Sequence, residues 1–254
     1  MSDQRKYIYF LSDLHLGASY ITDSRAHERR IVAWLRSIAS EAREVYLLGD
    51  VLDYWYEYRE VVPKGYVRFF GALADLTDSG VKVTWLKGNH DIWIFDYIPT
   101  ELGVEVVDGL CERTIDGHRF VMEHGDGVGE MDTSFRMLRS TFRNSTCQKL
   151  FSGIHPRWTI PFAHRWSAHS RMNGTEPTES HLDENDPLVR FCIDYNLAHP
   201  QHRAEYFLFG HRHLLIDQPL ADGARMVVLG DCFRQFSFAR FDGSRLTLGY
   251  MPTI

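Results

Sequence analysis

The sequence predicts an α/β fold in which a mainly parallel sheet carries helices on its faces. In the first hundred residues, short apolar runs alternate with amphipathic segments, and this β-α-β-α-β order is typical of parallel sheets. Further short apolar runs follow after residue 100 and again after residue 205, and a long segment without such alternation separates them. At 254 residues, the chain is long enough for one substantial domain with an inserted subdomain.

The alternating half begins with a buried strand at residues 7–11. A helix is predicted over 24–42, because Ile31, Leu35 and Ile38 recur at helical spacing. The elements that follow are a strand at 45–48, a helix at 66–77 and a strand at 81–86. Ligands bind at the carboxyl ends of such strands, so these ends are where a site is expected.

The second half of the chain combines short strands with a helical stretch. The strands are predicted at 104–107, 111–115, 119–123, 206–209, 226–229, 236–241 and 246–250. Residues 127 to about 200 look helical and are dense in Phe, Trp, His and Arg. We therefore expect a single domain over residues 1–254, with a helical insertion at roughly 127–200 between two core strands.

The overall composition indicates which partners and which cellular compartment to expect. A net charge of -6 argues against nucleic acid as a partner, because such surfaces need clustered Lys and Arg. The four cysteines form no C-x-x-C pair and suit the reduced thiols of a cytoplasmic protein. The polar start indicates no signal peptide, and no apolar run is long enough to span a bilayer. We expect a cytoplasmic protein that is soluble or at most attached to a membrane surface.

Five polar clusters each follow directly after a predicted strand. They are Asp13-Leu14-His15, Gly49-Asp50 with Asp53 beyond, Gly88-Asn89-His90-Asp91, His124-Gly125-Asp126 and Gly210-His211-Arg212-His213. Because side chains alternate along a strand, Asp13 and His15 should point the same way from one strand end. The glycines allow the backbone to turn tightly beside a ligand.

Carboxylate, imidazole and amide oxygen are together the ligands of manganese, iron, zinc and similar ions. One carboxylate shared by two ions can hold them about 3.5–4 Å apart, the separation used for phosphate displacement. A single D-x-H or N-H-D is more often an ordinary turn or a capped loop. Five clusters in register with strand ends favour a metal centre, because burying so many polar groups without an ion is costly. The sequence thus predicts cleavage of a phosphorus–oxygen bond by a metal-activated water.

In this order, the clusters resemble the calcineurin-like metallophosphoesterase superfamily over nearly the whole chain. The resemblance implies a four-layer αββα sandwich with a helical cap insertion. It also implies two divalent metal ions, with manganese expected and iron or zinc as alternatives. One ligand set would be Asp13, His15, Asp50 and His213, and the other Asp50, Asn89, His124 and His211, with Asp50 bridging.

The same resemblance implies a catalytic set of Asn89, His90 and Asp91. His90 would contact the phosphoryl group or protonate the leaving group, and Asp91 would orient His90. The metal pair would lower the pKa of a bridging water, and the ions together with His90 would stabilise charge on the phosphoryl oxygens.

Within the superfamily, the chain looks most like the UDP-2,3-diacylglucosamine diphosphatases of lipid A biosynthesis. The likeness lies in Asp13-Leu14-His15-Leu16, residues 49–55, the early His124-Gly125-Asp126 and the aromatic-basic insertion. The implied reaction hydrolyses the pyrophosphate of this acylated nucleotide-sugar to UMP and 2,3-diacylglucosamine 1-phosphate. Peripheral contact with the cytoplasmic face of the inner membrane is an option that the likeness adds.

The insertion would supply the substrate contacts, which are Asp132, Phe135, Arg157, Arg165, Ser170 and Arg171. The chain departs from the family at His90, where many members carry arginine, and at Ser167, which replaces the arginine of the cap's Arg-x-x-Ser. The apolar side chains of the insertion suit acyl chains, although an aromatic stripe in a helical hairpin usually forms core.

Two other functions stay open. A broader metallophosphoesterase would act on a soluble nucleotide or phosphomonoester. A protein of another class, a non-catalytic interaction module on the same scaffold, would use the aromatic insertion to dock a partner. Such modules typically lose metal ligands, whereas none is missing in this sequence.

Overall fold

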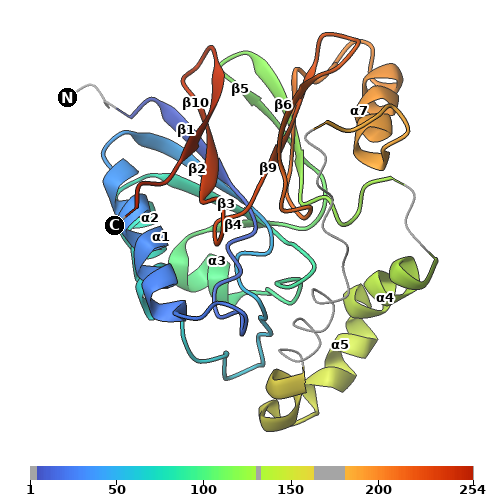
Figure 1. Ribbon diagram of the computed structural model, residues 1–254. Helices are drawn as coiled ribbons and strands as arrows, with labels where there is room; N and C mark the ends of the chain where they lie inside the picture. Colours follow the sequence, from blue (N-terminus) through green and yellow to red (C-terminus); the bar gives the residue numbers. More distant parts are fainter. Residues whose placement is uncertain (1–4, 130–132, 163–180, 254) are drawn as a thin grey trace.

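Two β-sheets packed face to face, with helices on both outer sides, form the body of the protein (Figure 1). The computed structural model describes residues 5–129, 133–162 and 181–253. The first sheet has the strand order β11-β10-β1-β2-β3-β4 and the second β5-β6-β7-β9-β8. In the described ranges, no helix has both the length and the apolar composition needed to cross a bilayer.

The first sheet is parallel in its centre and antiparallel at one side. Its parallel strands are β1 (Tyr7–Leu11), β2 (Ala42–Leu48), β3 (Lys82–Leu86) and β4 (Glu105–Val107). The antiparallel strands β10 (Ser237–Phe241) and β11 (Leu246–Tyr250) extend it beyond β1. The carboxyl ends of β1, β2 and β3 therefore lie at the same edge.

The second sheet is parallel in its centre and antiparallel at both sides. Its strands are β5 (Cys111–Ile115), β6 (His118–Glu123), β7 (Tyr206–Phe209), β8 (Leu215–Pro219) and β9 (Arg225–Leu229). The central strands β6, β7 and β9 are parallel, and β5 and β8 close the two sides in antiparallel pairing.

The apolar runs seen in the sequence are buried on both faces because each sheet is covered on both sides. Between the sheets, Phe10 of β1 stacks on Phe120 of β6 with ring centroids 5.6 Å apart. On the outer face of the first sheet, Tyr9 and Leu11 pack with the helices. Alternate residues of one strand thus serve two separate cores.

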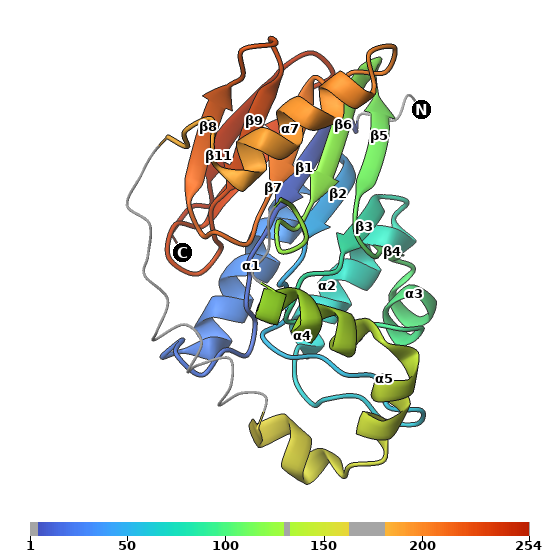
Figure 2. The same ribbon diagram turned by 90° about the vertical axis from the view of Figure 1, so that its right-hand side faces the viewer.

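Helices complete a four-layer αββα sandwich, which confirms the predicted fold class (Figure 2). The helices α1 (Ser24–Ile38), α2 (Val67–Asp78) and α3 (Tyr97–Leu102) cover the first sheet. Helix α7 (Pro187–Ala198) covers the second sheet.

The helices α4 (Thr133–Arg143) and α5 (Ser145–Ser152) stand apart from both outer layers, beside the edge where the parallel strands end (Figures 1 and 2). A further α-helical segment spans 156–162. We call residues 133–162 the cap. Helix α7 also falls inside the predicted insertion of 127–200, yet it packs on the second sheet through Leu188, Val189 and Cys192.

The strands predicted from apolar runs agree with the structure within three residues at each end. Helix α1 ends at Ile38, earlier than predicted, because the chain already enters β2 at Ala42. Two short elements, α3 and β8, were not predicted. Strand β8 lies at the side of its sheet and ends in Pro219, and its inward side chains, Ile216 and Gln218, are of mixed polarity.

Candidate metal centre

The five predicted clusters meet at the edge where the parallel strands end. Strands β1, β2 and β3 lead into the loops of Asp13, Asp50 and Asn89, and β6 and β7 lead into those of His124 and His211. Backbone hydrogen bonds join neighbouring loops directly, for example from Asp13 N–H to the carbonyl of Gly49 at 3.1 Å. The structure therefore brings together every side chain predicted to bind metal.

Asp13, His15 and His213 form one group of potential ligands, which we call the first group. Their ligand atoms all lie within 4.8 Å of one another. The Oδ1 atom of Asp13 lies 3.6 Å from Nε2 of His15 and 3.4 Å from Nε2 of His213. This Oδ1 atom is buried and accepts no hydrogen bond from the described residues. A buried carboxylate oxygen facing two imidazoles is a fitting ligand for a divalent cation.

Asp50, His124 and His211 form the second group, again within 4.8 Å of one another. Nε2 of His124 lies 3.4 Å from Oδ2 of Asp50 and 3.3 Å from Oδ1 of Asn89. The same Oδ2 atom of Asp50 is 3.6 Å from Nε2 of His15 in the first group. Asp50 thus lies between the two groups, as a bridging ligand must.

His15 and His124 direct Nε2 inward and place Nδ1 beside an acceptor of the protein. Nδ1 of His124 is 2.7 Å from the carbonyl of Leu48. Nδ1 of His15 is 3.4 Å from Oδ1 of Asp53. Metal-binding histidines usually have such a partner on the second nitrogen, because it fixes the tautomer and the ring orientation. The donor set therefore fits divalent metal ions in both groups.

His90 faces the same centre and forms, with His15 and Asp53, a third group of potential ligands within 4.8 Å of one another. Its Nδ1 lies 2.9 Å from the carbonyl oxygen of Asp53 and 3.7 Å from the carboxylate Oδ1 of the same residue. Its Nε2 lies 3.8 Å from Oδ2 of Asp50. His90 is thus oriented with Nε2 towards the space between the two groups.

Asp91 has a different neighbourhood from the one expected. Its Oδ1 accepts the N–H of Gly88 at 2.7 Å, and its Oδ2 accepts the N–H of Val51 at 2.8 Å and the indole N–H of Trp85 at 3.1 Å. Asp91 therefore holds two ligand loops together. The carboxylate beside His90 belongs to Asp53, a residue that the sequence placed near the cluster without a role.

The backbone of the centre lies in the left-handed region at five ligand positions. The φ angles are 54° at Asp13, 43° at His15, 50° at Asp50, 68° at His211 and 54° at His213. The strand alternation invoked from the sequence is therefore the wrong reason for the convergence of these side chains. Tight left-handed turns direct them instead, at a cost of about 1–3 kcal/mol per residue. Asp and His accept this conformation more readily than most residues do.

Two glycines permit the close approach of the loops. A Cβ at Gly88 would overlap the Oδ1 atom of Asp50. At Gly49, φ is +85°, and a Cβ would lie 2.6 Å from Nδ1 of His124. Side chains at these two positions would displace ligands of the second group.

The electrostatics of the centre favour ionised carboxylates. Burial alone would raise the pKa of Asp50, but the neighbouring His124 and His90 bring this pKa well below its ordinary value. The same balance lowers the pKa of Asp13. Burial and the nearby His124 lower the pKa of His211 to about 4, so its imidazole is neutral near pH 7 and offers a lone pair. Burial would lower the pKa of His124, but Asp50 and the other nearby carboxylates raise it well above its ordinary value, so a metal ion would displace a proton from this imidazole on binding.

Asp231 is a further residue near the centre that the sequence did not indicate. It follows β9 in the segment Leu229-Gly230-Asp231, the same strand–glycine–aspartate pattern as Leu48-Gly49-Asp50. Its buried Oδ2 lies 3.9 Å from Nδ1 of His213. The repeated pattern was the signal by which Asp231 could have been found.

The cap is joined to the strand-end loops by an aromatic cluster. Tyr54, Tyr56, Ile92 and Trp93 form a buried set against which Phe142, Phe151 and Ile160 of the cap pack. The indole N–H of Trp93 donates to the carbonyl of Phe142 at 2.9 Å, and the hydroxyl of Tyr56 donates to that of Gln148 at 2.6 Å. Trp55, by contrast, is buried in the core beneath the first sheet.

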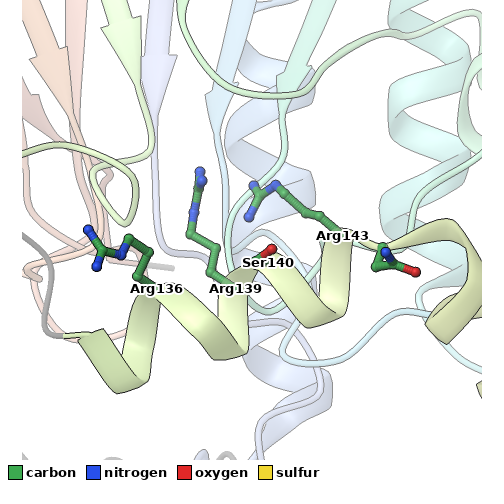
Figure 3. Close-up of a pocket in the computed structure, with 5 residues that line it drawn as sticks. Arg136, Arg139, Ser140 and Arg143 are labelled. Atoms are coloured by element: carbon green, nitrogen blue, oxygen red, sulfur yellow. The ribbon is translucent and has the colours of Figure 1, made fainter.

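Three arginines of α4 point from the cap towards the body and line a pocket of about 450 Å³ (Figure 3). Nε of Arg139 lies 2.8 Å from Oδ2 of Asp126, and Nε of Arg143 lies 3.1 Å from Oδ1 of Asp108. Arg136 makes no ion pair with any residue that the structure describes. The pocket is therefore lined by three guanidinium groups, two of which are paired with carboxylates of the body.

Only part of the predicted substrate-binding set is described. Arg157 is exposed on the cap, next to Trp158. Phe135 lies in α4, and its side chain is outside the described part. The other predicted residues, Asp132, Arg165, Ser170 and Arg171, lie outside the described residues.

The fold and the two groups define a metal-dependent phosphoesterase. The family described as calcineurin-like phosphoesterase matches residues 6–215, and the chain belongs to this family. This confirms the predicted family and the prediction of a hydrolytic enzyme.

Among curated relatives, a protein of Porphyromonas gingivalis named UDP-2,3-diacylglucosamine hydrolase is 39% identical, over 97% of this chain and 98% of its own. Proteins of the same name from Serratia proteamaculans and Vibrio vulnificus are 26% and 25% identical, and each alignment covers 96% of this chain. It covers 98% of the Serratia protein and 97% of the Vibrio protein.

Proposed function

We propose that the protein hydrolyses the pyrophosphate of UDP-2,3-diacylglucosamine, releasing UMP and 2,3-diacylglucosamine 1-phosphate. The observation that carries this proposal is the full-length likeness to relatives of that name, with the cap region included. The complete set of potential metal ligands at the strand ends supports a catalytic role. It speaks against a non-catalytic interaction module, which would have no use for two buried ligand groups.

In the proposed site, Asp13, His15, Asp50 and His213 hold one divalent metal ion. Asp50, Asn89, His124 and His211 hold the other. Manganese is the proposed metal. When bound, such a pair supplies a water that is deprotonated near neutral pH and positive charge for the phosphoryl oxygens.

The protein's own residues then position and protonate the substrate. The carbonyl of Asp53 accepts the Nδ1–H of His90, which leaves Nε2 directed at the centre. In the imidazolium form, His90 also carries a proton on Nε2, and from there it can donate this proton to the leaving phosphate or a hydrogen bond to the phosphoryl oxygen. Asp91 keeps the loops of Gly88 and Val51 in place.

The decisive experiment compares substrates with and without acyl chains. We expect the manganese-loaded protein to cleave UDP-2,3-diacylglucosamine to UMP, and to act on UDP-glucose at least about 100-fold less efficiently in kcat/KM. Such a ratio corresponds to about 2.7 kcal/mol of differential binding, which a buried apolar chain readily supplies. Equal efficiency on UDP-glucose would favour the alternative of an enzyme for soluble nucleotides.

Peripheral contact with a membrane surface is part of this proposal. The cap exposes several large apolar side chains, which are Met137, Leu150, Ile154, Trp158 and Phe162. Arg157 adds positive charge beside Trp158, and apolar groups flanked by cations suit an anionic lipid surface. We expect the protein to sediment with vesicles of phosphatidylglycerol. The variant Trp158→Ala should instead stay in the supernatant. The matched variant Tyr250→Ala, changed on the edge strand β11, should sediment as the wild type does.

A further inference from the structure

Two aromatic side chains border the first group. Tyr20 lies in the loop that precedes α1, and Phe233 lies in the loop between β9 and β10. The ring centroid of Phe233 is 5.7 Å from that of His15 and 5.3 Å from that of His213, both in edge-to-face geometry. The rings of Tyr20 and Phe233 are 5.6 Å apart. We call this pair the aromatic wall.

The aromatic wall and the cap lie at opposite ends of the candidate centre. The described contacts of the cap involve residues 54–58, 93, 108, 123 and 126, in the segments that follow β2, β3, β4 and β6. The aromatic wall comes from the segments after β1 and β9. In the sheets, β1 is separated from β3 by β2, and β9 from β6 by β7. Figure 2 shows α4 and α5 on one side of the strand ends and the start of α1 on the other.

This arrangement bears on how a nucleotide-sugar would lie in the site. Hydrolysis of a pyrophosphate separates two halves of one molecule, and these halves extend in different directions from the reacting phosphorus. With the acylated sugar beneath the cap, the nucleotide half would point towards the aromatic wall. This placement of the nucleotide half depends on the proposed substrate.

The chemistry of the aromatic wall suits a nucleobase. Aromatic side chains stack on any nucleobase, whatever its hydrogen-bonding groups, because every base has a π-face. Tyr20 is 37% exposed and Phe233 is partly buried, so the wall combines an accessible ring with a fixed one. The exposed Arg234 carries its guanidinium 5.5 Å from the ring centroid of Phe233, and this cation lies within reach of a base carbonyl or a phosphate.

We propose that Tyr20 and Phe233 form a nucleobase subsite beside the first group, on the side remote from the cap. The subsite would take the base of the nucleotide half of the substrate, and the adjoining phosphate would reach the metal ligands. It would also hold UMP after the bond is cut.

The test measures binding of UMP and of ribose 5-phosphate to the manganese-loaded protein by calorimetry. Both ligands carry the same sugar and a phosphate, and only UMP carries a base. We expect the wild type to bind UMP about tenfold or more tightly than ribose 5-phosphate, as stacking of one base allows. The variants Phe233→Leu and Tyr20→Leu should each lose most of this preference while binding ribose 5-phosphate as before. Tyr250→Leu, an exposed tyrosine on β11, should behave as the wild type.

Two results would overturn the proposal. One is equal binding of both ligands by the wild type. The other is an equal loss of both ligands in Phe233→Leu, accompanied by a lower manganese content, because Phe233 would then only support His15 and His213. The substrate assay on UDP-2,3-diacylglucosamine is independent. If the protein prefers UMP but does not cleave this lipid, the proposed subsite stands and the proposed substrate is wrong.

Discussion

The strand-end centre and the cap are two neighbouring parts of the molecule, and they are built in different ways. In the centre, Asp13, His15 and Asp50 are at most 1% exposed and are held by left-handed turns. In the cap, large apolar side chains remain in contact with solvent, with Leu150 72% and Trp158 69% exposed. The cap is joined to the body by one aromatic cluster and a few charged pairs.

The difference agrees with the roles proposed for the two parts. Two sheets fix the strand ends, so short loops can hold ligands in strained conformations that a flexible segment could not maintain. The cap instead leaves apolar surface accessible, which is the property needed to receive an acyl chain or a lipid surface. Substitutions in the centre should therefore abolish hydrolysis, whereas substitutions around it should reduce activity or metal affinity by smaller factors.

The largest effect is expected from Asp50→Ala. Asp50 lies between both groups, so its removal should release both metal ions and lower kcat/KM by at least about a thousandfold. The metal content, measured by elemental analysis, and the rate of hydrolysis should fall together. Full activity in a variant that has lost its metal would end the idea of a two-metal centre.

The second largest effect on activity is expected from His90→Asn. A positioned general acid contributes about 10²–10⁴-fold to a rate, so we expect kcat to fall by about a hundredfold or more. His90 lies outside the two ligand groups of the proposed centre but forms a third set of potential ligands with His15 and Asp53, so metal content is measured beside kcat to separate loss of proton transfer from loss of metal. An unchanged kcat in the metal-loaded variant would show that His90 has no role in proton transfer.

Gly88→Ala tests whether the close packing of the ligand loops is required. The added methyl would displace the carboxylate of Asp50, which should cost about 1–3 kcal/mol of stability and about a hundredfold in kcat. The matched control is Gly71→Ala, at an exposed position of α2 where a Cβ meets nothing within 4 Å. Alanine there should stabilise the helix by up to about 1 kcal/mol and leave activity unchanged. Denaturant unfolding and steady-state rates measure both effects, and equal behaviour of the two variants would contradict the packing argument.

The same contrast explains how far the sequence could predict the molecule. The candidate ligands could be located from the sequence because each follows an apolar run, and parallel strands must end at a common edge. Asp53 could not be assigned over Asp91 as the partner of His90, since each lies in one of the polar clusters and only the loop conformation decides which carboxylate faces the ring. Helix α7 was attributed to the insertion because its polar residues, such as Arg190 and Asp194, masked the apolar side that packs on the second sheet. Helical periodicity in the cap predicts two faces, but it does not say which face meets the body.

The smallest effect is expected from Asp231→Asn, which sharpens the comparison within the centre. The Oδ1 atom of Asp231 accepts the N–H groups of Phe233, Arg234 and Gln235, and its Oδ2 faces Nδ1 of His213 at 3.9 Å. Asparagine keeps an oxygen for the loop and removes the negative charge beside the histidine. Since such outer partners contribute about 10–100-fold to metal affinity, manganese should bind about tenfold more weakly in calorimetry, with the melting temperature of the metal-free protein unchanged.

Asp242→Asn is the matched control for this last experiment. Asp242 also caps two backbone N–H groups with Oδ1, those of Ser244 and Arg245, but it lies in an exposed turn between β10 and β11. Its variant should bind manganese as the wild type does. If Asp231→Asn does the same, Asp231 only holds its loop. If Asp231→Asn alone binds manganese more weakly, the charge of Asp231 orients His213, and the rigidity of the strand-end centre extends beyond the residues that bind the metal.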